Sequence, residues 1–257
     1  MILGADIGNS SIGFCGMEAG SGQIRFQSRM DTHPLQTVER YAEELRRLLR
    51  PFSGALEPVE GSIVSSVVPA ATQPVCAALT ALTGTPPLLV TPDLHTDLNM
   101  ESAPNTVVGA DLIAAACAAI HWHPLPAIVV DMGTATTVMA VDGARYLRGG
   151  GILPGVRVSM QSLLGATAQL DCVPLEAPGH AIGRTTAECI QSGILYGAAG
   201  AIDGLITRIE EELGTSATLI ATGGMAPRII PLCRHKLLWE PDLLLKGLSL
   251  LYAQNRL

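Results

Sequence analysis

Two short segments of this chain resemble each other, and they carry the residues best suited to chemistry. The run Asp6-Ile7-Gly8-Asn9-Ser10-Ser11-Ile12-Gly13 follows an apolar start, and the run Asp131-Met132-Gly133-Thr134 follows Ile128-Val129-Val130. In both, a carboxylate at the end of an expected buried strand precedes a glycine and then hydroxyl or amide side chains. Such a turn can hold a metal ion through its carboxylate while backbone N–H groups contact phosphate oxygens. Two of them predict a phosphotransferase that holds a nucleotide between two related domains.

The first turn has two interpretations. As a phosphate site, Gly8 lets the backbone approach the ligand because it has no Cβ. Asn9 and Ser10 then donate to phosphate oxygens, and Asp6 holds Mg²⁺ through water. As an ordinary hairpin turn, the segment contains only residue types that are common in turns. The second acidic turn, at Asp131, favours the phosphate site, since two such turns after two buried strands are not expected by chance.

Hydroxyl side chains follow the second turn. The run Thr134-Ala135-Thr136-Thr137 is also what the start of a strand looks like, because threonine is favoured in strands. Beside the carboxylate of Asp131 we interpret the run as a phosphate and cation site, with Thr134 as the nucleotide contact.

Asp111 lies at the expected start of an apolar helix, after Gly109-Ala110. One interpretation is a helix cap or an acid of the first turn, which is common at such a place. The other is a general base that orients and deprotonates an alcohol during phosphoryl transfer. The residue types alone leave both open and favour the cap.

Three glycine-containing segments are weaker candidates. The run from Gly149 to Gly155 is expected to be a flexible hinge or a loop that lines a ligand. In Gly183-Arg184-Thr185-Thr186, Thr186 is either a helix cap or a ligand contact. In Thr222-Gly223-Gly224, the glycines would let an adenine or a ribose lie against the backbone.

Composition sets limits on function. The 257 residues are enough for two domains, 48% of them are hydrophobic, and the net charge is -7. That charge, with no basic stripe, argues against a nucleic-acid partner. The six cysteines form no Cys-x-x-Cys pair and are expected to be reduced, in a cytoplasmic protein. We expect no signal peptide, because the start lacks a basic and then apolar segment, and no membrane-spanning segment.

The expected elements occur as two similar series. Each begins with three strands, at 1–6, 11–17 and 24–29 and again at 127–131, 135–141 and 145–149, and then continues with helices and strands. The later elements are helices at 37–50, 69–82 and 111–120, strands at 62–68 and 87–90, then helices at 155–166, 184–198, 199–213 and 241–254 and a strand at 218–221. Two prolines at 124 and 126 place the junction between domains 1–122 and 123–257. The pattern predicts an α/β protein, and the doubled turns predict a duplicated ribonuclease-H-like fold, the actin-like ATPase architecture, with two similar domains around a nucleotide cleft.

Over nearly its whole length the chain resembles type III pantothenate kinases, members of the sugar-kinase, actin and heat-shock ATPase superfamily. The resemblance rests on an ordered set of segments rather than on one motif. These are the two acidic turns already described, Ser65-Ser66-Val67-Val68-Pro69, Gly109-Ala110-Asp111, Gly150-Gly151-Ile152-Leu153-Pro154-Gly155, Gly183-Arg184-Thr185-Thr186, Gln191-Ser192-Gly193, Thr222-Gly223-Gly224 and the run from Pro241 to Leu248.

The resemblance implies ATP-dependent phosphorylation of pantothenate, the first step towards coenzyme A. It implies a homodimer, Mg²⁺ with ATP, and a monovalent cation, K⁺ or NH₄⁺. By the same resemblance, residues 6–13 and Thr134 bind ATP, and Asp131 binds the monovalent cation. Asp111 is the proton acceptor, and Gly109-Ala110-Asp111-Leu112 and Thr186 bind pantothenate.

The chain departs from the family pattern at the acceptor side. The pattern reads Gly-x-Asp-Arg, whereas Leu112 follows Asp111 here and cannot replace five N–H donors. The aromatic residue that the pattern has shortly upstream is also missing from 99–104. Two alternatives therefore remain: a kinase of the same superfamily that acts on another small alcohol, and a non-catalytic regulatory homologue.

Overall fold

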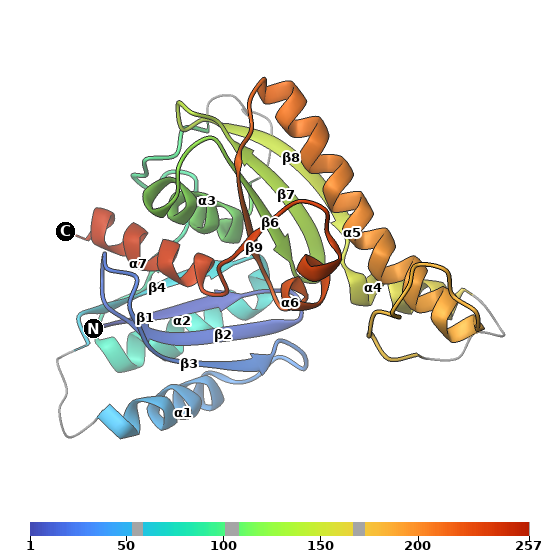
Figure 1. Ribbon diagram of the computed structural model, residues 1–257. Coiled ribbons are helices and arrows are strands. Elements are labelled where there is room, and N and C mark those ends of the chain that lie inside the picture. The colour runs from blue at the N-terminus through green and yellow to red at the C-terminus, as the bar shows by residue number, and fades with distance from the viewer. Residues whose placement is uncertain (53–58, 101–107, 167–172, 257) are drawn as a thin grey trace. The chain divides into compact units, whose positions relative to one another are not determined.

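The computed structural model describes residues 1–52, 59–100, 108–166 and 173–256, which form two compact units (Figure 1). The first unit contains residues 1–100, the described residues up to Trp122, and the C-terminal segment from Asp242. The second unit runs from His123 to Pro241.

The first unit is built on a five-stranded mixed sheet. Its strands are β1 (Ile2–Ile7), β2 (Ser11–Met17), β3 (Ile24–Asp31), β4 (Gly61–Ser66) and β5 (Leu88–Leu89), in the order β3-β2-β1-β4-β5. β1 pairs antiparallel with β2 and parallel with β4. In this register Asp6 lies opposite Gly13 on one side and Ser65 on the other. The carboxylate of the first turn therefore has a neighbour on each flanking strand.

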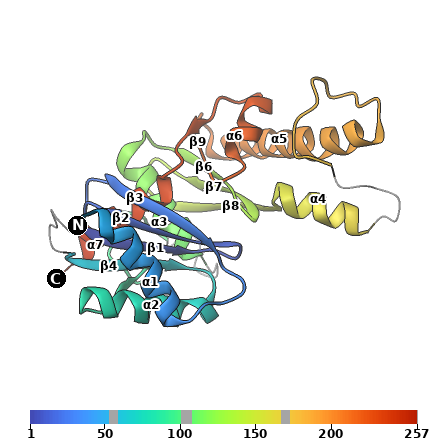
Figure 2. The ribbon, with the colours of Figure 1, turned by 90° about the horizontal axis from the view of Figure 1, so that it is seen from below.

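Two pairs of helices complete the first unit. α1 (Val38–Leu49) and α2 (Pro69–Thr83) pack against each other and bury one face of the sheet around Tyr41 (Figure 2). The short helix η1 (Arg50–Phe52) follows α1. α3 (Ala110–Trp122) packs against α7 (Leu243–Asn255), and α7 also contacts β1 and β4.

The second unit repeats this plan. Its strands β6 (Ala127–Met132), β7 (Ala135–Val141), β8 (Leu147–Pro154), β9 (Thr218–Thr222) and β10 (Leu238–Trp239) take the order β10-β9-β6-β7-β8. Read in reverse, as β8-β7-β6-β9-β10, this order matches the order β3-β2-β1-β4-β5 of the first sheet strand by strand. The helices are α4 (Val156–Gly165), α5 (Thr186–Leu213), α6 (Ala226–Ile229) and η2 (Ile230–Leu232). Asp131 takes the place of Asp6, with Thr137 and Thr222 opposite it on the flanking strands.

The structure differs from the sequence-based expectation in several elements. The last helix, α7, was expected in the domain 123–257 but belongs to the first unit. The Ala-rich α3 is buried on nearly all sides, and α7 packs against it and shields it from solvent. The run 149–154 is strand β8 rather than a flexible loop, and Gly150 lies there because a Cβ would come within 1.8 Å of the carbonyl oxygen of Val138. Residues 186–213 form one helix rather than two. β10 was not expected, because two residues are too short for a recognisable pattern.

By length and composition alone, α5 could cross a membrane. Its apolar residues have another explanation within the second unit. Ile190, Leu195, Ala199, Ile202 and Ile206 are buried, and most of them belong to the core under the second sheet. Of the most apolar stretch of α5, 33% is buried, so core packing accounts for part of its hydropathy.

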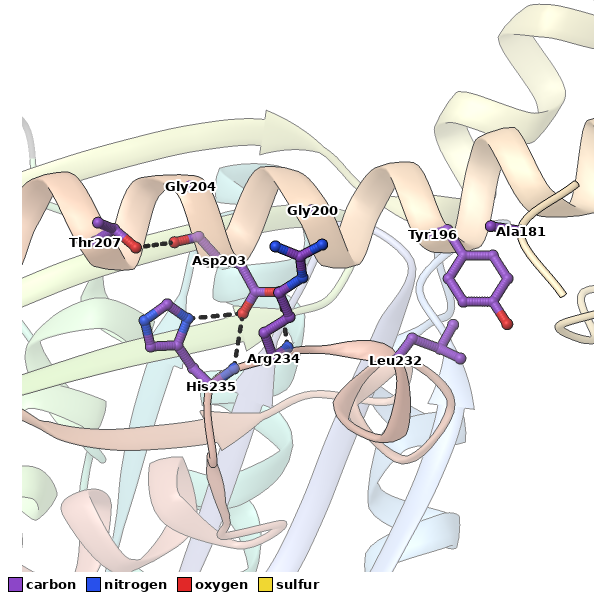
Figure 3. Close-up of a pocket in the computed structure, with 9 residues that line it drawn as sticks. All are labelled: Ala181, Tyr196, Gly200, Asp203, Gly204, Thr207, Leu232, Arg234 and His235. Atoms are coloured by element: carbon purple, nitrogen blue, oxygen red, sulfur yellow. Dashed lines mark hydrogen bonds and ion pairs between the residues drawn. The ribbon is translucent and has the colours of Figure 1, made fainter.

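A buried carboxylate ties α5 to the segment between η2 and β10 (Figure 3). Asp203 accepts hydrogen bonds from the backbone N–H of Arg234 at 2.8 Å and of His235 at 3.0 Å, and its Oδ1 lies 2.8 Å from Nδ1 of His235. Burial alone would raise the pKa of Asp203, but these hydrogen bonds outweigh it and hold the pKa below its ordinary value. A cavity of about 560 Å³ lies beside these three contacts, and Tyr196 and Thr207 also line it.

Substituting Gly247 by alanine should destabilise the first unit. The added Cβ would lie 1.9 Å from the carbonyl oxygen of Ala114, so α3 and α7 must separate. We expect a loss of about 2–3 kcal/mol in the free energy of unfolding, measured in urea. Gly165→Ala is the matched control, because it lies at a helical position with open space and should be neutral or slightly stabilising. Equal stability of the two variants would contradict the close approach of α3 and α7.

Asp203→Asn should lower stability in a pH-dependent way. Because the folded pKa of Asp203 is below the unfolded one, its contribution is complete above the unfolded pKa and is lost as pH falls through the folded pKa. We expect the variant to be about 2–4 kcal/mol less stable than the wild type near pH 7, and the difference to shrink below about pH 4. Urea unfolding at several pH values measures this difference. A difference that stays constant with pH would refute the role of the charge.

Candidate active site

The first acidic turn is held from three sides. Oδ1 of Asp6 accepts a hydrogen bond from Ser65 Oγ at 3.1 Å, and the backbone N–H of Gly8 donates to Ser11 O at 3.0 Å. The buried Thr32 donates from Oγ1 to Gly8 O at 2.6 Å and from its N–H to Ser10 O at 3.2 Å. The backbone of the turn is therefore held by hydrogen bonds to Ser11 and Thr32. The side chains of residues 9 and 10 take no part in these bonds and are exposed.

Sequence reasoning did not select Ser65 or Thr32. Ser65 stands in one of the segments that carry the family resemblance, so a signal for it existed. Thr32 lies 24 residues from Gly8, and nothing in its own surroundings marks it as a support of the turn.

Asp111 lies in the first turn of α3 and is half-buried. Its Oδ1 accepts from the backbone N–H of Leu112 at 2.9 Å, as expected of an acid in a first helical turn. Among the described residues, Oδ2 has no hydrogen-bond partner. A Cβ at Gly109 would lie 2.4 Å from Asp111 Oδ1, so only glycine leaves the carboxylate in this position. One oxygen thus serves the helix, while the other remains available for chemistry.

Asp6 and Asp111 lie at the same edge of the first sheet. Val67 follows β4 and donates from its N–H to Ile7 O at 3.0 Å, at the end of β1. Its side chain is also the neighbour of Gly109, since a Cβ there would lie 3.6 Å from Val67 Cγ1. The carboxyl ends of β1 and β4 and the start of α3 therefore meet around Val67. In open α/β sheets, ligands bind at this edge.

A cavity of about 460 Å³ opens at the same edge, against the start of α2. Its lining includes Ser66 and Thr72, whose hydroxyl oxygens lie 2.7 Å apart, together with Val67, Gln73 and Thr91. None of the site residues predicted from the sequence, that is, the catalytic, ATP-binding, substrate-binding and metal-binding residues, lines this cavity or the one beside Asp203.

The second acidic turn is closed by its neighbours' backbone. The N–H of Gly133 donates to Ala135 O at 3.0 Å, and the N–H of Gly155 donates to Thr134 O at 3.1 Å. A Cβ at Gly155 would come within 2.3 Å of Thr134 O, so a glycine is required there. The side chain of Thr134 is exposed, and its role as the nucleotide contact stays a prediction.

The carboxylate of Asp131 lies against a bare stretch of backbone. Gly223 has a φ of +90°, and a Cβ on it would lie 2.5 Å from Asp131 Oδ1. Thr222 is 4% exposed, and Thr137 has a buried Oγ1 that lacks a hydrogen-bond partner among the described residues. Both threonines lie opposite Asp131 in register, so their side chains leave the sheet on its face. Sequence reasoning named Asp131 and the threonine run but did not select Thr137 or Thr222 as its neighbours.

These donor sets suit hard cations. Among the described residues, no group of three or more His, Cys, Asp or Glu side chains is placed to hold a metal ion. Each turn instead offers one carboxylate with hydroxyl neighbours. Mg²⁺ keeps several waters and is commonly bound by one or two carboxylates together with substrate phosphates, and alkali cations also take oxygen ligands. The residues present therefore fit a cation that arrives with, or beside, a phosphate ligand.

Thr186 begins α5, but it is not the cap. The cap is Thr185, whose side chain accepts from Glu188 N at 3.2 Å, while Glu188 Oε2 accepts from Arg184 N at 2.7 Å. Thr186 is exposed, so its hydroxyl is not used in capping the helix. The cap interpretation of Thr186 is therefore wrong, and the ligand contact stays a prediction.

The buried thiols of Cys15 and Cys117 are poor candidates for chemistry. Burial raises the pKa of Cys15 and of Cys117 to about 12, so both stay protonated at neutral pH.

Comparison with known proteins identifies the family. A family model described as type III pantothenate kinase matches residues 2–208. A type III pantothenate kinase from Rubrobacter xylanophilus is 40% identical over 263 aligned positions, covering 99% of this chain and 98% of the relative.

Solved structures share the fold at low identity. A Baf family transcriptional activator from Campylobacter jejuni matches with a TM-score of 0.64 and 17% identity, over 99% of this chain and 98% of that one. The activator of 2-hydroxyisocaproyl-CoA dehydratase from Clostridium difficile, with bound ADPNP, matches at 0.56 and 12%, over 99% and 94%. A polyphosphate/ATP-glucomannokinase from Arthrobacter matches at 0.51 and 18%, over 96% of both chains.

The predicted fold class, a duplicated α/β fold of the actin-like kinase type, is confirmed by the two five-stranded mixed sheets and by these structures. The family model and the relative extend across both units. The chain belongs to the type III pantothenate kinase family.

Proposed function

We propose that this chain transfers the γ-phosphoryl group of ATP to the primary hydroxyl of pantothenate, giving 4'-phosphopantothenate in the first step of coenzyme A biosynthesis. The observation that carries the proposal is the 40% identity to a type III pantothenate kinase over 99% of the chain. The arrangement of Asp6 and Asp111 at one edge of the first sheet supports it.

The first turn would receive the phosphates of ATP. The exposed Asn9 and Ser10 are placed to donate to phosphate oxygens, and the backbone at Gly8 can be approached closely. Asp6, fixed by Ser65, would hold Mg²⁺ through water. Bound together with ATP, Mg²⁺ would neutralise part of the negative charge of the phosphates.

Asp111 would accept the proton of the pantothenate hydroxyl. Its Oδ1 is engaged by the N–H of Leu112, which fixes the orientation of the carboxylate and leaves Oδ2 for the substrate. In phosphoryl transfer, positioning and charge neutralisation supply most of the rate, and the base orients the attacking oxygen. A carboxylate held by its own helix suits this role.

The second turn would contribute the nucleotide contact Thr134 and the monovalent cation site at Asp131. The oxygen-only surroundings of Asp131, with Thr137 and Thr222 opposite it, support K⁺ or NH₄⁺ as the ion. Thr186, at the start of α5, would contact pantothenate through the hydroxyl that capping leaves unused.

A second candidate function is suggested by Leu112. The family pattern has arginine at this position, and a half-buried leucine offers no donor to an anionic acceptor. A kinase of the same superfamily acting on another small alcohol is therefore the alternative. A non-catalytic homologue is less well supported, since Asp6, Asp111 and Asp131 are all present.

We further propose a cytoplasmic homodimer. Among the described residues 152–166 and 173–182 of the second unit, four large apolar side chains are exposed: Ile152, Val158, Leu163 and Ile182. Ile152 and Ile182 are 76% and 79% exposed. Burial of such side chains against a second copy would contribute about 1.5–3 kcal/mol each.

Asp111→Asn should abolish turnover while ATP still binds. Removing a general base lowers the rate by about 100-fold or more. The measurement is phosphorylation of pantothenate with Mg·ATP and KCl, with ATP affinity measured by calorimetry. Asp93→Asn, an exposed aspartate of the same unit, is the control and should leave the rate unchanged. A variant of Asp111 with near-normal turnover would show that the base has been misassigned.

Leu112→Arg should show whether the acceptor is the anionic pantothenate or an uncharged small alcohol. If pantothenate is the substrate, a restored charge-assisted hydrogen bond should lower its KM by about tenfold or more, because such bonds contribute about 1.5–3 kcal/mol. Steady-state kinetics with pantothenate and with uncharged alcohols measures the effect, and the melting temperature shows whether the variant is folded. A lower KM for uncharged alcohols, or no change for pantothenate, would favour the other small-alcohol kinase.

A further inference from the structure

The cavity beside Asp203 is lined by residues to which the proposed function gives no role (Figure 3). Its volume of about 560 Å³ is within the range of small-molecule sites. One wall is a bare stretch of α5, because Gly200 and Gly204 are about one helical turn apart and a Cβ on Gly200 would meet no atom within 4 Å. Leu232 and Tyr196 add apolar surface. The cavity therefore has room for a flat apolar group against the helix.

Two side chains that can bind an anion line the same cavity from the segment after η2. The guanidinium of Arg234 has no hydrogen bond or ion pair with any described residue, and in Figure 3 it reaches towards α5. His235 uses Nδ1 for Asp203, and its Nε2 has no such partner either. Arginine forms charge-assisted, often bidentate hydrogen bonds with carboxylates and phosphates. The polar end of the cavity therefore suits an anionic group.

Asp203 holds these two residues in place. Its carboxylate accepts from the backbone N–H groups of Arg234 and His235, at 2.8 and 3.0 Å, and lies 2.8 Å from Nδ1 of the imidazole. The three donors compensate the negative charge of Asp203, and the contact with Nδ1 fixes the ring with Nε2 on the side away from the carboxylate. Both anion-binding groups are thus positioned before a ligand arrives, which lowers the cost of binding.

An aspartate–histidine pair also occurs in hydrolytic sites, where the histidine activates a nucleophile. The hydroxyls that line this cavity are engaged elsewhere. Tyr196 donates to Pro178 O at 3.0 Å, and Thr207 donates to Asp203 O, also at 3.0 Å. No serine or cysteine is among the described residues that line the cavity. The side chains therefore suit binding rather than catalysis.

We infer that this cavity binds a small organic anion, whose carboxylate or phosphate group contacts Arg234 and His235 while its flat apolar part lies on α5 at Gly200 and Gly204. The site is distinct from the acidic turns, because none of the residues assigned to ATP, pantothenate or the cations lines it. The inference does not depend on the proposed function. A bound anion would connect α5 to the segment after η2 and so stabilise the second unit.

Nuclear magnetic resonance of the isotope-labelled, full-length protein locates the ligand. Phenyl phosphate and benzoate should each shift the amide signals of Gly200 and Gly204 in a saturable way, and the tighter of the two shows which anion the site prefers. Benzyl alcohol, which has the ring but no charge, should bind at least about tenfold more weakly than the tighter anion. Equal binding of benzyl alcohol, or no saturable shift at these two glycines with either anion, would overturn the inference.

Arg234→Gln tests the anion contact. It should weaken binding of the tighter anion about tenfold or more, because charge-assisted hydrogen bonds contribute that much. Arg228→Gln is the matched control, since Arg228 is an exposed arginine of α6 that does not line the cavity. It removes the same charge from the chain and should change the affinity by no more than about twofold. Equal effects of the two substitutions would mean that the anion responds to net charge and not to this site.

Gly200→Leu tests the apolar wall. The leucine should occupy the cavity and abolish anion binding, while the melting temperature does not fall, because the position is open and leucine favours a helix. Gly197→Leu is the matched control in the same helix, since Gly197 is equally open but does not line the cavity. If the Gly200 variant binds the anion as tightly as the control does, the ligand lies elsewhere and the inference is wrong.

Discussion

A carboxylate on the penultimate residue of the central strand is the constraint around which each sheet is arranged. β1 and β6 each have an antiparallel neighbour on one side and a parallel neighbour on the other. The side chains of Asp6 and Asp131 must therefore fit between residues of two flanking strands. A carboxylate in such a place is costly unless polar groups or a cation compensate it. Ser65 on a flanking strand provides that compensation for Asp6, and Thr137 and Thr222 place hydroxyl groups on the strands that flank Asp131.

The two turns share a plan but not their details, and the differences suggest different partners. In the first unit, Ser65 donates to Asp6, and Gly13 leaves the other side open. In the second, threonines flank Asp131, and the bare backbone of Gly223 lies against its carboxylate. A carboxylate already bonded to a hydroxyl suits binding of Mg²⁺ through water. Under the proposed function, a carboxylate flanked by two threonines would suit direct contact with a larger, weakly hydrated cation.

The local pattern of the sequence predicted much of this, because the signals are local. Alternation and apolar runs placed the main strands, and helical spacing placed α1 within a residue of each end. What it did not predict depends on contacts between distant segments. Thr32 supports Gly8 from 24 residues away, and Asp203 holds the backbone of a segment more than 30 residues later. The return of α7 to the first unit is likewise set by the need to cover α3, which a count of elements along the chain does not show.

The two kinds of recognition in this molecule differ in how they respond to substitution. Phosphates would be met at turns fixed by Thr32 in one unit and Gly155 in the other. Several exposed side chains there, Asn9, Ser10 and Thr134, would share the contact, so the loss of one of them removes only part of the interaction. The acceptor would be met by single side chains, of which Asp111 alone is held by a described hydrogen bond. Loss of one donor, as at Leu112, then removes a whole interaction rather than a fraction of one. Under the proposed function, substitutions on the acceptor side would therefore change acceptor binding more sharply than nucleotide binding, and Leu112 is a position at which this chain departs from the family pattern.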